Sequence, residues 1–134
     1  MCLLDEVIDW GPAGIRCRTA THRSAGNPLR ARGELGAACA IEYAAQAMAL
    51  HGALLAPGVA PTPRAGMLAS TRGVTLNVAR LDDVPGELIV SASYVHGDAA
   101  MVLYGFAVSS AAAVLVTGRA AIAFRSAAQA AGSE

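Results

Sequence analysis

The sequence predicts an α+β domain in which one curved antiparallel β-sheet wraps around a single long central helix. Residues 37–56, AACAIEYAAQAMALHGALLA, have the composition of a helix and contain only one carboxylate, Glu42. A helix that is apolar nearly all round is normally buried. From residue 66 onward, β-prone segments follow one another with short connections, as in an antiparallel sheet. A sheet that covers the helix on most sides accounts for both observations.

The N-terminal part of the chain predicts a short strand region and an irregular loop. Residues 3–10 read as a short strand or a helical turn that leads into a first strand, and residues 15–21 alternate in polarity like a half-exposed strand. Residues 23–36 contain Gly, Asn and Pro that break any periodicity, so they predict a loop. Pro57 follows the expected end of the helix, where a proline is a normal stop signal.

The C-terminal half predicts four antiparallel strands joined by turns. These strands are expected over residues 66–81, 87–95, 99–110 and 113–124. The sequence shows no internal repeat and no second unit, and 134 residues suit one domain. We therefore expect one domain over residues 1–125, followed by a flexible tail over residues 126–134.

The composition disfavours several classes of partner. The ten basic and ten acidic residues cancel, so neither nucleic acid nor a membrane surface is expected as a partner. The three cysteines show no CxxC or Cys/His spacing, so reduced thiols and no metal site are expected. The first residues do not resemble a signal peptide. We also find no apolar run of the ~18 residues that a membrane-spanning helix needs. The expected location is the cytoplasm.

A histidine and a carboxylate are the candidates for chemistry. Glu42 and Gln46 are four residues apart on the helix, so they share one face. His22 precedes the irregular loop that leads to the helix, and a histidine with a carboxylate in an apolar groove suits general acid–base work. Two simpler interpretations stay open. His22 could be an edge-strand histidine, and Glu42 could be a carboxylate favoured by the helix dipole.

The other two histidines are expected to be structural. His51 lies nine positions beyond Glu42, about half a helical turn away in direction, so it points to the opposite face. We expect His51 to be an ordinary histidine with a backbone or water partner. His96 stands beside an expected hairpin turn and should be exposed to solvent. Tyr43 is expected to pack, with its hydroxyl at an edge.

Three stretches of the chain carry a resemblance to a known family. They are LLDEVIDW at 3–10, HRSAGNPLR at 22–30 and IEYAAQAMALHGALLA at 41–56. Together they resemble the hot-dog-fold 3-hydroxyacyl-acyl carrier protein dehydratases, closest to the small dehydratases of aryl-polyene biosynthesis clusters. The resemblance implies a hot-dog fold, subunits paired edge to edge, and active sites at the interface that use a histidine and a helix carboxylate. By position, His22, Glu42 and Gln46 match the residues of that site, and the family's reaction uses no metal and no cofactor.

The sequence departs from the family pattern at two places around this site. His22 is followed by Arg23 and a longer loop, where the housekeeping enzymes have Phe-Pro and a short one. The family's Pro-Gly before the helix is replaced by Leu35-Gly36-Ala37, so backbone donors for a thioester oxygen are expected near Gly36. Asn27 in the longer loop could be a second polar group that binds substrate, or a turn residue before proline.

The function expected from this resemblance is dehydration of a 3-hydroxyacyl thioester, carried by an acyl carrier protein, to a trans-2-enoyl thioester. The expected assembly is a homodimer or a heterodimer with another hot-dog protein. Two alternatives stay open: a hot-dog acyl thioesterase, and an inactive hot-dog subunit that binds acyl chains or stabilises an active partner. Arg23, Arg30 and Arg32 could receive an acidic carrier protein, or they could be ordinary solvated loop arginines.

Overall fold

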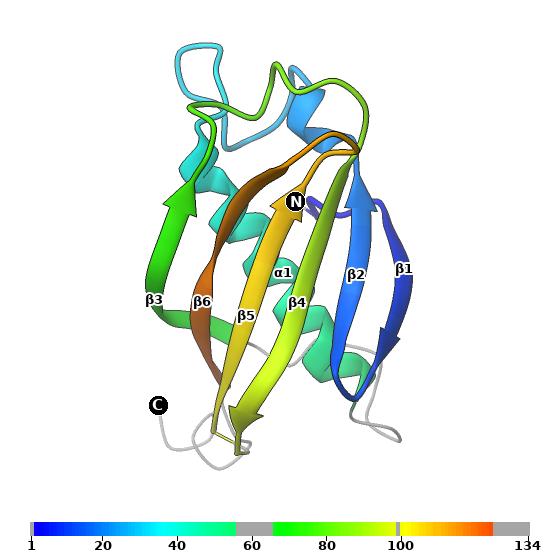
Figure 1. Cartoon of the computed structure of the whole chain (residues 1–134), viewed down its shortest axis with the longest axis vertical. Coiled ribbons are helices and arrows are strands. Elements are labelled where there is room, and N and C mark those ends of the chain that lie inside the picture. Colours follow the sequence, from blue (N-terminus) through cyan, green and yellow to red (C-terminus); the bar gives the residue numbers. More distant parts are fainter. Residues whose placement is uncertain (1, 56–65, 99, 125–134) are drawn as a thin grey trace, which may run out of the picture.

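In the computed structural model, which describes residues 2–55, 66–98 and 100–124, six antiparallel strands form one curved sheet packed on one helix (Figure 1). The order of strands across the sheet is β1-β2-β4-β5-β6-β3. The strands are β1 (Glu6–Gly11), β2 (Gly14–Thr19), β3 (Gly66–Leu76), β4 (Leu88–Gly97), β5 (Met101–Ser109) and β6 (Val114–Phe124). The helix α1 (Ala40–Leu54) follows two 3-10 turns, η1 (Thr21–Arg23) and η2 (Ala37–Cys39). The predicted fold class is confirmed.

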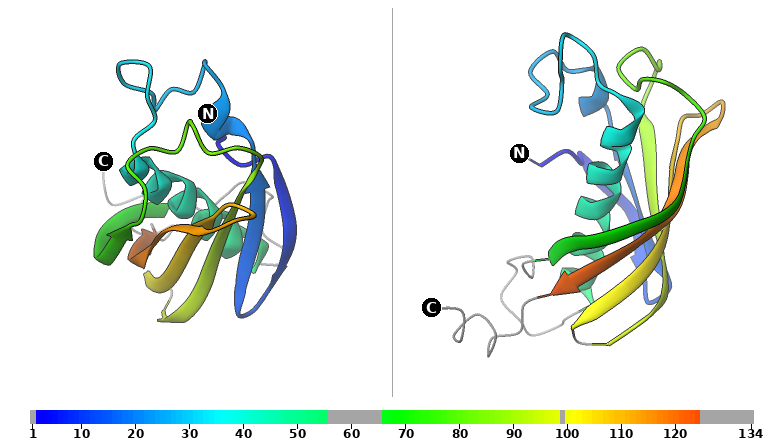
Figure 2. Two further views of the ribbon diagram at one scale, coloured as in Figure 1. Left: turned by 45° about the horizontal axis from the view of Figure 1, so that its top comes forward. Right: turned by 90° about the vertical axis from the view of Figure 1, so that its left-hand side faces the viewer.

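The helix buries one face against the sheet. Its buried residues recur at helical spacing, and half of them are alanines, which let the strands approach closely: Ala40, Tyr43, Ala44, Ala47, Met48 and His51. On the opposite face, Glu42 is exposed and Ala45, Gln46 and Ala49 are half-buried. In Figure 2 the helix lies on the concave side of the sheet. The expectation that the sheet covers most sides of the helix is therefore wrong, because one curved layer contacts only one side of a cylinder.

The strands alternate as the sequence predicts. Along β4, Leu88, Val90 and Ala92 are buried toward the helix, while Ser91 and Ser93 point to the other face. The hydrophobic core lies between this inner face and α1. The C-terminal end of α1 is fixed by His51, which is fully buried. His51 Nδ1 lies 2.7 Å from the Tyr104 hydroxyl, and His51 Nε2 lies 2.6 Å from the Gly11 carbonyl oxygen.

One strand ends earlier than the sequence predicts. The strand expected over residues 66–81 stops at Leu76. The following segment leaves the sheet and pairs with the chain that enters the helix: Ala37 N–H donates to Ala79 O (3.0 Å), and Leu81 N–H donates to Leu35 O (2.7 Å). These bonds hold residues 79–81 against the chain that enters the helix and fix the loop beside the start of the helix.

Some expectations fall outside the described residues. The boundary at residue 125, the tail over 126–134 and the connector over 59–64 lie there. Within the described ranges, no helix is long and apolar enough to cross a membrane.

Candidate functional site

His22 is a buried residue in a 3-10 turn, not an edge-strand residue. It is 0% exposed and lies in η1, directly after β2. Its Nε2 lies 3.0 Å from the carbonyl oxygen of Val84. A carbonyl only accepts, so Nε2 carries the proton and Nδ1 carries the lone pair. Nδ1 is buried and has no hydrogen-bond partner among the described residues.

The environment of His22 favours its neutral form. Burial lowers the pKa of the imidazole, and the nearby Arg23 charge adds to this effect. The bond to Val84 and the charge of the Asp82 carboxylate act in the opposite direction but do not reverse the lowering of the pKa. At neutral pH, His22 therefore presents an unprotonated nitrogen, which is the state that a general base requires.

The carbonyl that orients His22 belongs to a rigid turn. Asp82 accepts a hydrogen bond from Leu35 N–H (2.9 Å) and pairs with the Arg80 guanidinium, which together hold the pKa of the Asp82 carboxyl well below its usual range. Val84 N–H closes the turn on Leu81 O at 3.0 Å. This turn, η1 and the loop over residues 24–36 gather at one end of the molecule (Figure 1).

A buried hydrogen-bond chain ties the His22 turn to α1. The Thr21 hydroxyl lies 2.8 Å from the Tyr43 hydroxyl, and Asn27 Nδ2 donates to the Tyr43 hydroxyl and to the Thr21 carbonyl, both at 2.9 Å. The Thr21 hydroxyl donates to Leu3 O (2.7 Å), so Tyr43 must donate to Thr21. Burial raises the pKa of Tyr43, which keeps the phenol protonated as this role needs.

Asn27 has the contacts of a turn residue. Besides its two Nδ2 bonds, its Oδ1 accepts from Leu29 N–H at 2.9 Å, two residues further along the chain. Its side chain is 4% exposed. The amide is thus engaged within the loop itself, and it holds the peptide bond that joins Thr21 to His22.

Glu42 lies on the exposed face of the first turn of α1, where the helix dipole favours negative charge. Its carboxylate makes no hydrogen bond or ion pair within the described part of the chain, and none joins it to His22. In the sequence, however, His22 directly follows Thr21, and Glu42 directly precedes Tyr43. The hydroxyls of Thr21 and Tyr43 are in contact. The structure therefore brings the His22 turn and the start of the helix together.

Gln46 lies one turn beyond Glu42 and contacts the N-terminal segment. Its Oε1 accepts from Leu3 N–H at 2.7 Å. Gln46 also lines a largely apolar hollow of about 250 Å³ on the same side of α1, together with Cys2, Leu4, Ala49 and Leu50. This hollow is an apolar space beside Gln46 on that helix face.

Gly36 caps the 3-10 turn that opens the helix. Its φ of −63° suits any residue, and a Cβ at this position would meet nothing within 4 Å. Ala37 N–H is used on Ala79 O and Cys39 N–H on Gly36 O, whereas the Gly36 amide has no backbone partner among the described residues and interacts with the Cys39 thiol. A backbone amide that makes no bond to an oxygen atom within the described residues therefore lies at the expected place, at the positive end of the helix.

The three loop arginines differ from one another. Arg30 is half-buried, and its guanidinium donates to Ser24 O (2.7 Å) and Gly33 O (2.9 Å), so it holds the loop together. Arg23 and Arg32 are exposed and form no ion pair with any described residue. Only these two are available to a partner without loss of loop structure.

The other two histidines lie as their spacing predicts. His96 is exposed, as predicted. His51 has a backbone partner, as predicted, and in addition contacts Tyr104. Within the described ranges, no group of three or more His, Cys, Asp or Glu side chains could hold a metal ion.

The residues that orient His22 were not predicted. Val84 and Asp82 lie about sixty residues away in the sequence, within a stretch that reads only as a turn. Tyr43 was expected to pack with its hydroxyl at an edge, but the hydroxyl lies inside the buried chain of bonds. One feature of the sequence could have indicated a polar role for Tyr43: it directly follows Glu42 on a helix that contains few polar residues.

Comparisons with known proteins support the fold. The dehydratase heterocomplex ApeI:P from Xenorhabdus doucetiae superposes with a TM-score of 0.83 at 23% identity, over 97% of this chain and 87% of that chain. A thioesterase variant from Staphylococcus aureus superposes with a TM-score of 0.65 at 12% identity, over 90% of this chain and 93% of that chain. A Haemophilus influenzae thioesterase gives 0.55 at 11% identity, over 88% and 76%.

The sequence itself identifies the family. No curated protein sequence matches the chain significantly. A sequence model of the ApeP-like family, described as ApeP dehydratase, matches residues 1–131. This match covers almost the whole chain and confirms the predicted resemblance. The chain belongs to the ApeP-like family of dehydratases and has the hot-dog fold.

Proposed function

We propose that the protein dehydrates a 3-hydroxyacyl thioester, carried by an acyl carrier protein, to a trans-2-enoyl thioester. The observation that carries the proposal is the buried Nδ1 of His22. It has a lone pair, no partner among the described residues, and a ring held by Val84 O. In this proposal Nδ1 removes the proton at C2, and the bond from Nε2 to Val84 stabilises the imidazolium that forms.

Glu42 would complete the reaction by giving a proton to the 3-hydroxyl group as it leaves as water. Glu42 is exposed in the single subunit, which suits an active site that is completed when a second subunit covers this face of the helix. The helix face offers Ala45, Gln46 and Ala49 around it, which are small or polar. One edge of β3 is unpaired among the described strands, so a second hot-dog subunit, identical or different, could extend the sheet there.

The substrate would lie between these groups. The Gly36 amide would donate to the thioester oxygen as negative charge builds on it. The acyl chain would extend into the apolar hollow beside Leu4, Ala49 and Leu50, with Gln46 at its side. Arg23 of η1 and Arg32 of the following loop are exposed arginines near His22, and the acidic carrier protein would dock on them.

The test is turnover of a 3-hydroxyacyl carrier protein, followed by the appearance of the enoyl product. It should be run with the protein alone and after co-purification with a hot-dog partner. We expect His22→Gln and Glu42→Gln each to lower the rate by about 10²–10⁴-fold. The control is His96→Gln, since His96 is exposed and lies on β4, away from η1. Wild-type rates in both site variants would refute the mechanism.

Two further functions are separated by the same assay. The structural similarity to thioesterases favours acyl thioester hydrolysis as the second candidate. Release of free thiol without enoyl product would identify that activity. If turnover requires a partner and is unchanged by both site variants, the chain acts as a supporting subunit.

A further inference from the structure

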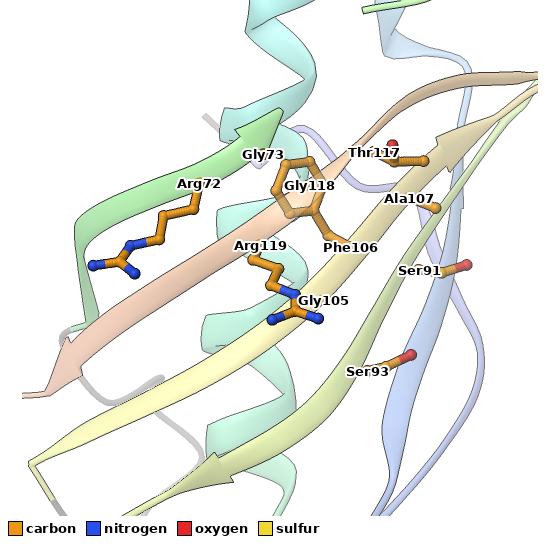
Figure 3. A pocket seen from close by; sticks show the side chains of 10 residues that line it. All are labelled: Arg72, Gly73, Ser91, Ser93, Gly105, Phe106, Ala107, Thr117, Gly118 and Arg119. Atoms are coloured by element: carbon orange, nitrogen blue, oxygen red, sulfur yellow. The ribbon is translucent and has the colours of Figure 1, made fainter. Parts of the chain in front are cut away.

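The sheet face that points away from α1 contains a hollow of about 660 Å³ (Figure 3). Figure 3 shows five polar side chains on this face, with α1 behind the sheet: Arg72, Arg119, Ser91, Ser93 and Thr117. The hollow is floored by small residues, including Gly105 and Ala107 of β5. It lies on the opposite side of the sheet from His22 and Glu42, so the proposed dehydratase site does not use it.

The polar side chains stand in two rows that cross the sheet. In one row Ser93 pairs with Gly105, Gly105 with Arg119, and Arg119 with Arg72. The central position of this row is a glycine, so β4 and β6 face each other there across a gap two strand spacings wide, about 9–10 Å. Figure 3 shows Arg119 reaching from β6 toward Gly105.

The second row repeats the arrangement with hydroxyl groups. Ser91 pairs with Ala107, and Ala107 pairs with Thr117. The side-chain hydroxyls of Ser91, Ser93 and Thr117 make no hydrogen bond within the described part of the chain. Hydrogen-bond donors therefore border the small central residues on both sides.

The two arginines form an unfavourable pair for the fold alone. Arg72 and Arg119 are exposed and stand directly opposite each other on β3 and β6, an arrangement of like charges that destabilises a sheet. Neither forms an ion pair with any described residue. By contrast, Arg16, which stands on the same sheet face opposite Ser91, pairs with Asp9. Among the described residues, no carboxylate forms an ion pair with Arg72 or Arg119.

The acid that shares a hollow with this pair does not neutralise it. Asp98 lines an adjoining hollow with Arg72, Arg119 and His96. Its carboxylate accepts from Ala100 N–H (2.8 Å) and Met101 N–H (3.0 Å), which lowers its pKa and holds it in its own hairpin. It forms no ion pair with either arginine.

We propose that the outer-face hollow binds a phosphate group, held by Arg72 and Arg119 with the Ser93 and Thr117 hydroxyls. A guanidinium presents a planar fork of donors that matches phosphate oxygens, and charge-assisted bonds of this kind are strong. Two guanidiniums and several hydroxyls offer more donors than one carboxylate can use. The phosphate belongs either to a small-molecule ester or to a phosphorylated protein segment, and the same groups would bind both.

The test is a titration with inorganic phosphate at constant ionic strength, followed by NMR of backbone amides and arginine Nε–H groups. We expect saturable shifts at Arg72, Arg119 and the backbone of Gly105. Arg72→Gln or Arg119→Gln should weaken binding about tenfold or more, the effect of one lost charge-assisted bond. Arg16→Gln is the matched control and should leave binding unchanged.

Further measurements identify the source of the phosphate group and separate loss of binding from loss of folding. Tighter binding of glycerol 3-phosphate than of inorganic phosphate assigns a small-molecule ester, and tighter binding of a phosphoserine peptide assigns a protein. Arg119→Lys keeps the charge but loses the fork, so it should fold like the wild type and bind with intermediate affinity. Linear, unsaturable shifts, or equal affinity in Arg16→Gln and Arg119→Gln, would overturn the proposal.

Discussion

Replacing Tyr43 with phenylalanine removes one hydroxyl from the centre of the buried chain of bonds that holds the His22 turn against α1. The ring stays, so the packing of this fully buried side chain is retained. Two hydrogen bonds are lost, one to Thr21 at 2.8 Å and one from Asn27 at 2.9 Å. Tyr43→Phe therefore isolates the contribution of the bonds from that of apolar burial.

The structure sets the expected magnitude. Both partners keep another bond, since Thr21 still donates to Leu3 O and Asn27 still donates to Thr21 O. At about 1 kcal/mol net for each lost bond, the free energy of unfolding should fall by about 2 kcal/mol. For a domain of this size, that loss lowers the Tm by roughly 5–10 °C. The dehydration rate should also fall, because the peptide before His22 loses part of its support.

The assay is urea unfolding at one fixed protein concentration, because subunit association would otherwise change the apparent stability. Tyr94→Phe is the matched control, since Tyr94 is 39% exposed and its hydroxyl makes only a long bond of 3.4 Å. Thr21→Val removes the other end of the same bond. The double variant should therefore be less destabilised than the sum of the single ones, by about 1 kcal/mol.

Two results would refute this reasoning. In the first, Tyr43→Phe changes stability no more than Tyr94→Phe does. In the second, the effects of Thr21→Val and Tyr43→Phe add fully, which would mean that their hydroxyls do not interact.

Three more predictions follow from the same site. Burial lowers the pKa of His22 from its ordinary value of 6.5, so the folded protein binds this proton less readily than the unfolded chain. Its contribution to stability is complete above pH 6.5 and is lost as the pH falls toward the lowered value; unfolding measured against pH should show this slope in the wild type and not in His22→Gln. Gly36→Ala should leave the Tm unchanged or slightly raised, because nothing lies within 4 Å of the added methyl group. It should raise KM for the thioester, because the methyl group would stand beside the amide that is proposed to bind the thioester oxygen. An unchanged KM would remove Gly36 from the substrate site. Tyr104→Phe leaves the buried His51 Nδ1 without its partner at 2.7 Å and should cost about 1–3 kcal/mol in urea unfolding, with turnover retained per folded molecule.

Much of the candidate site could be predicted from local sequence. Glu42 is the only carboxylate in an otherwise apolar helix, and its face followed from helical spacing alone. Gln46 shares that face in the structure, and His51 points the other way into the core. These predictions concern a single regular element, where the direction of each side chain depends only on its position in the repeat.

The surroundings of His22 could not be predicted in this way. Its ring is oriented by Val84, and its turn is fastened by Tyr43. Each of these contacts joins residues that are far apart in the sequence or on different elements. Local periodicity contains no information about such contacts, because they exist only once the sheet has curved around the helix.

The sequence by itself determined the fold class, the buried helix and the family. Apolar periodicity and the motif around Glu42 are properties of neighbouring residues, so they survive without the tertiary structure. Only the tertiary structure decided that His22 is buried with a nitrogen that has no partner among the described residues, and that Arg72 and Arg119 stand opposite each other. Burial and cross-strand register arise from packing distant segments together, which no single stretch of sequence specifies.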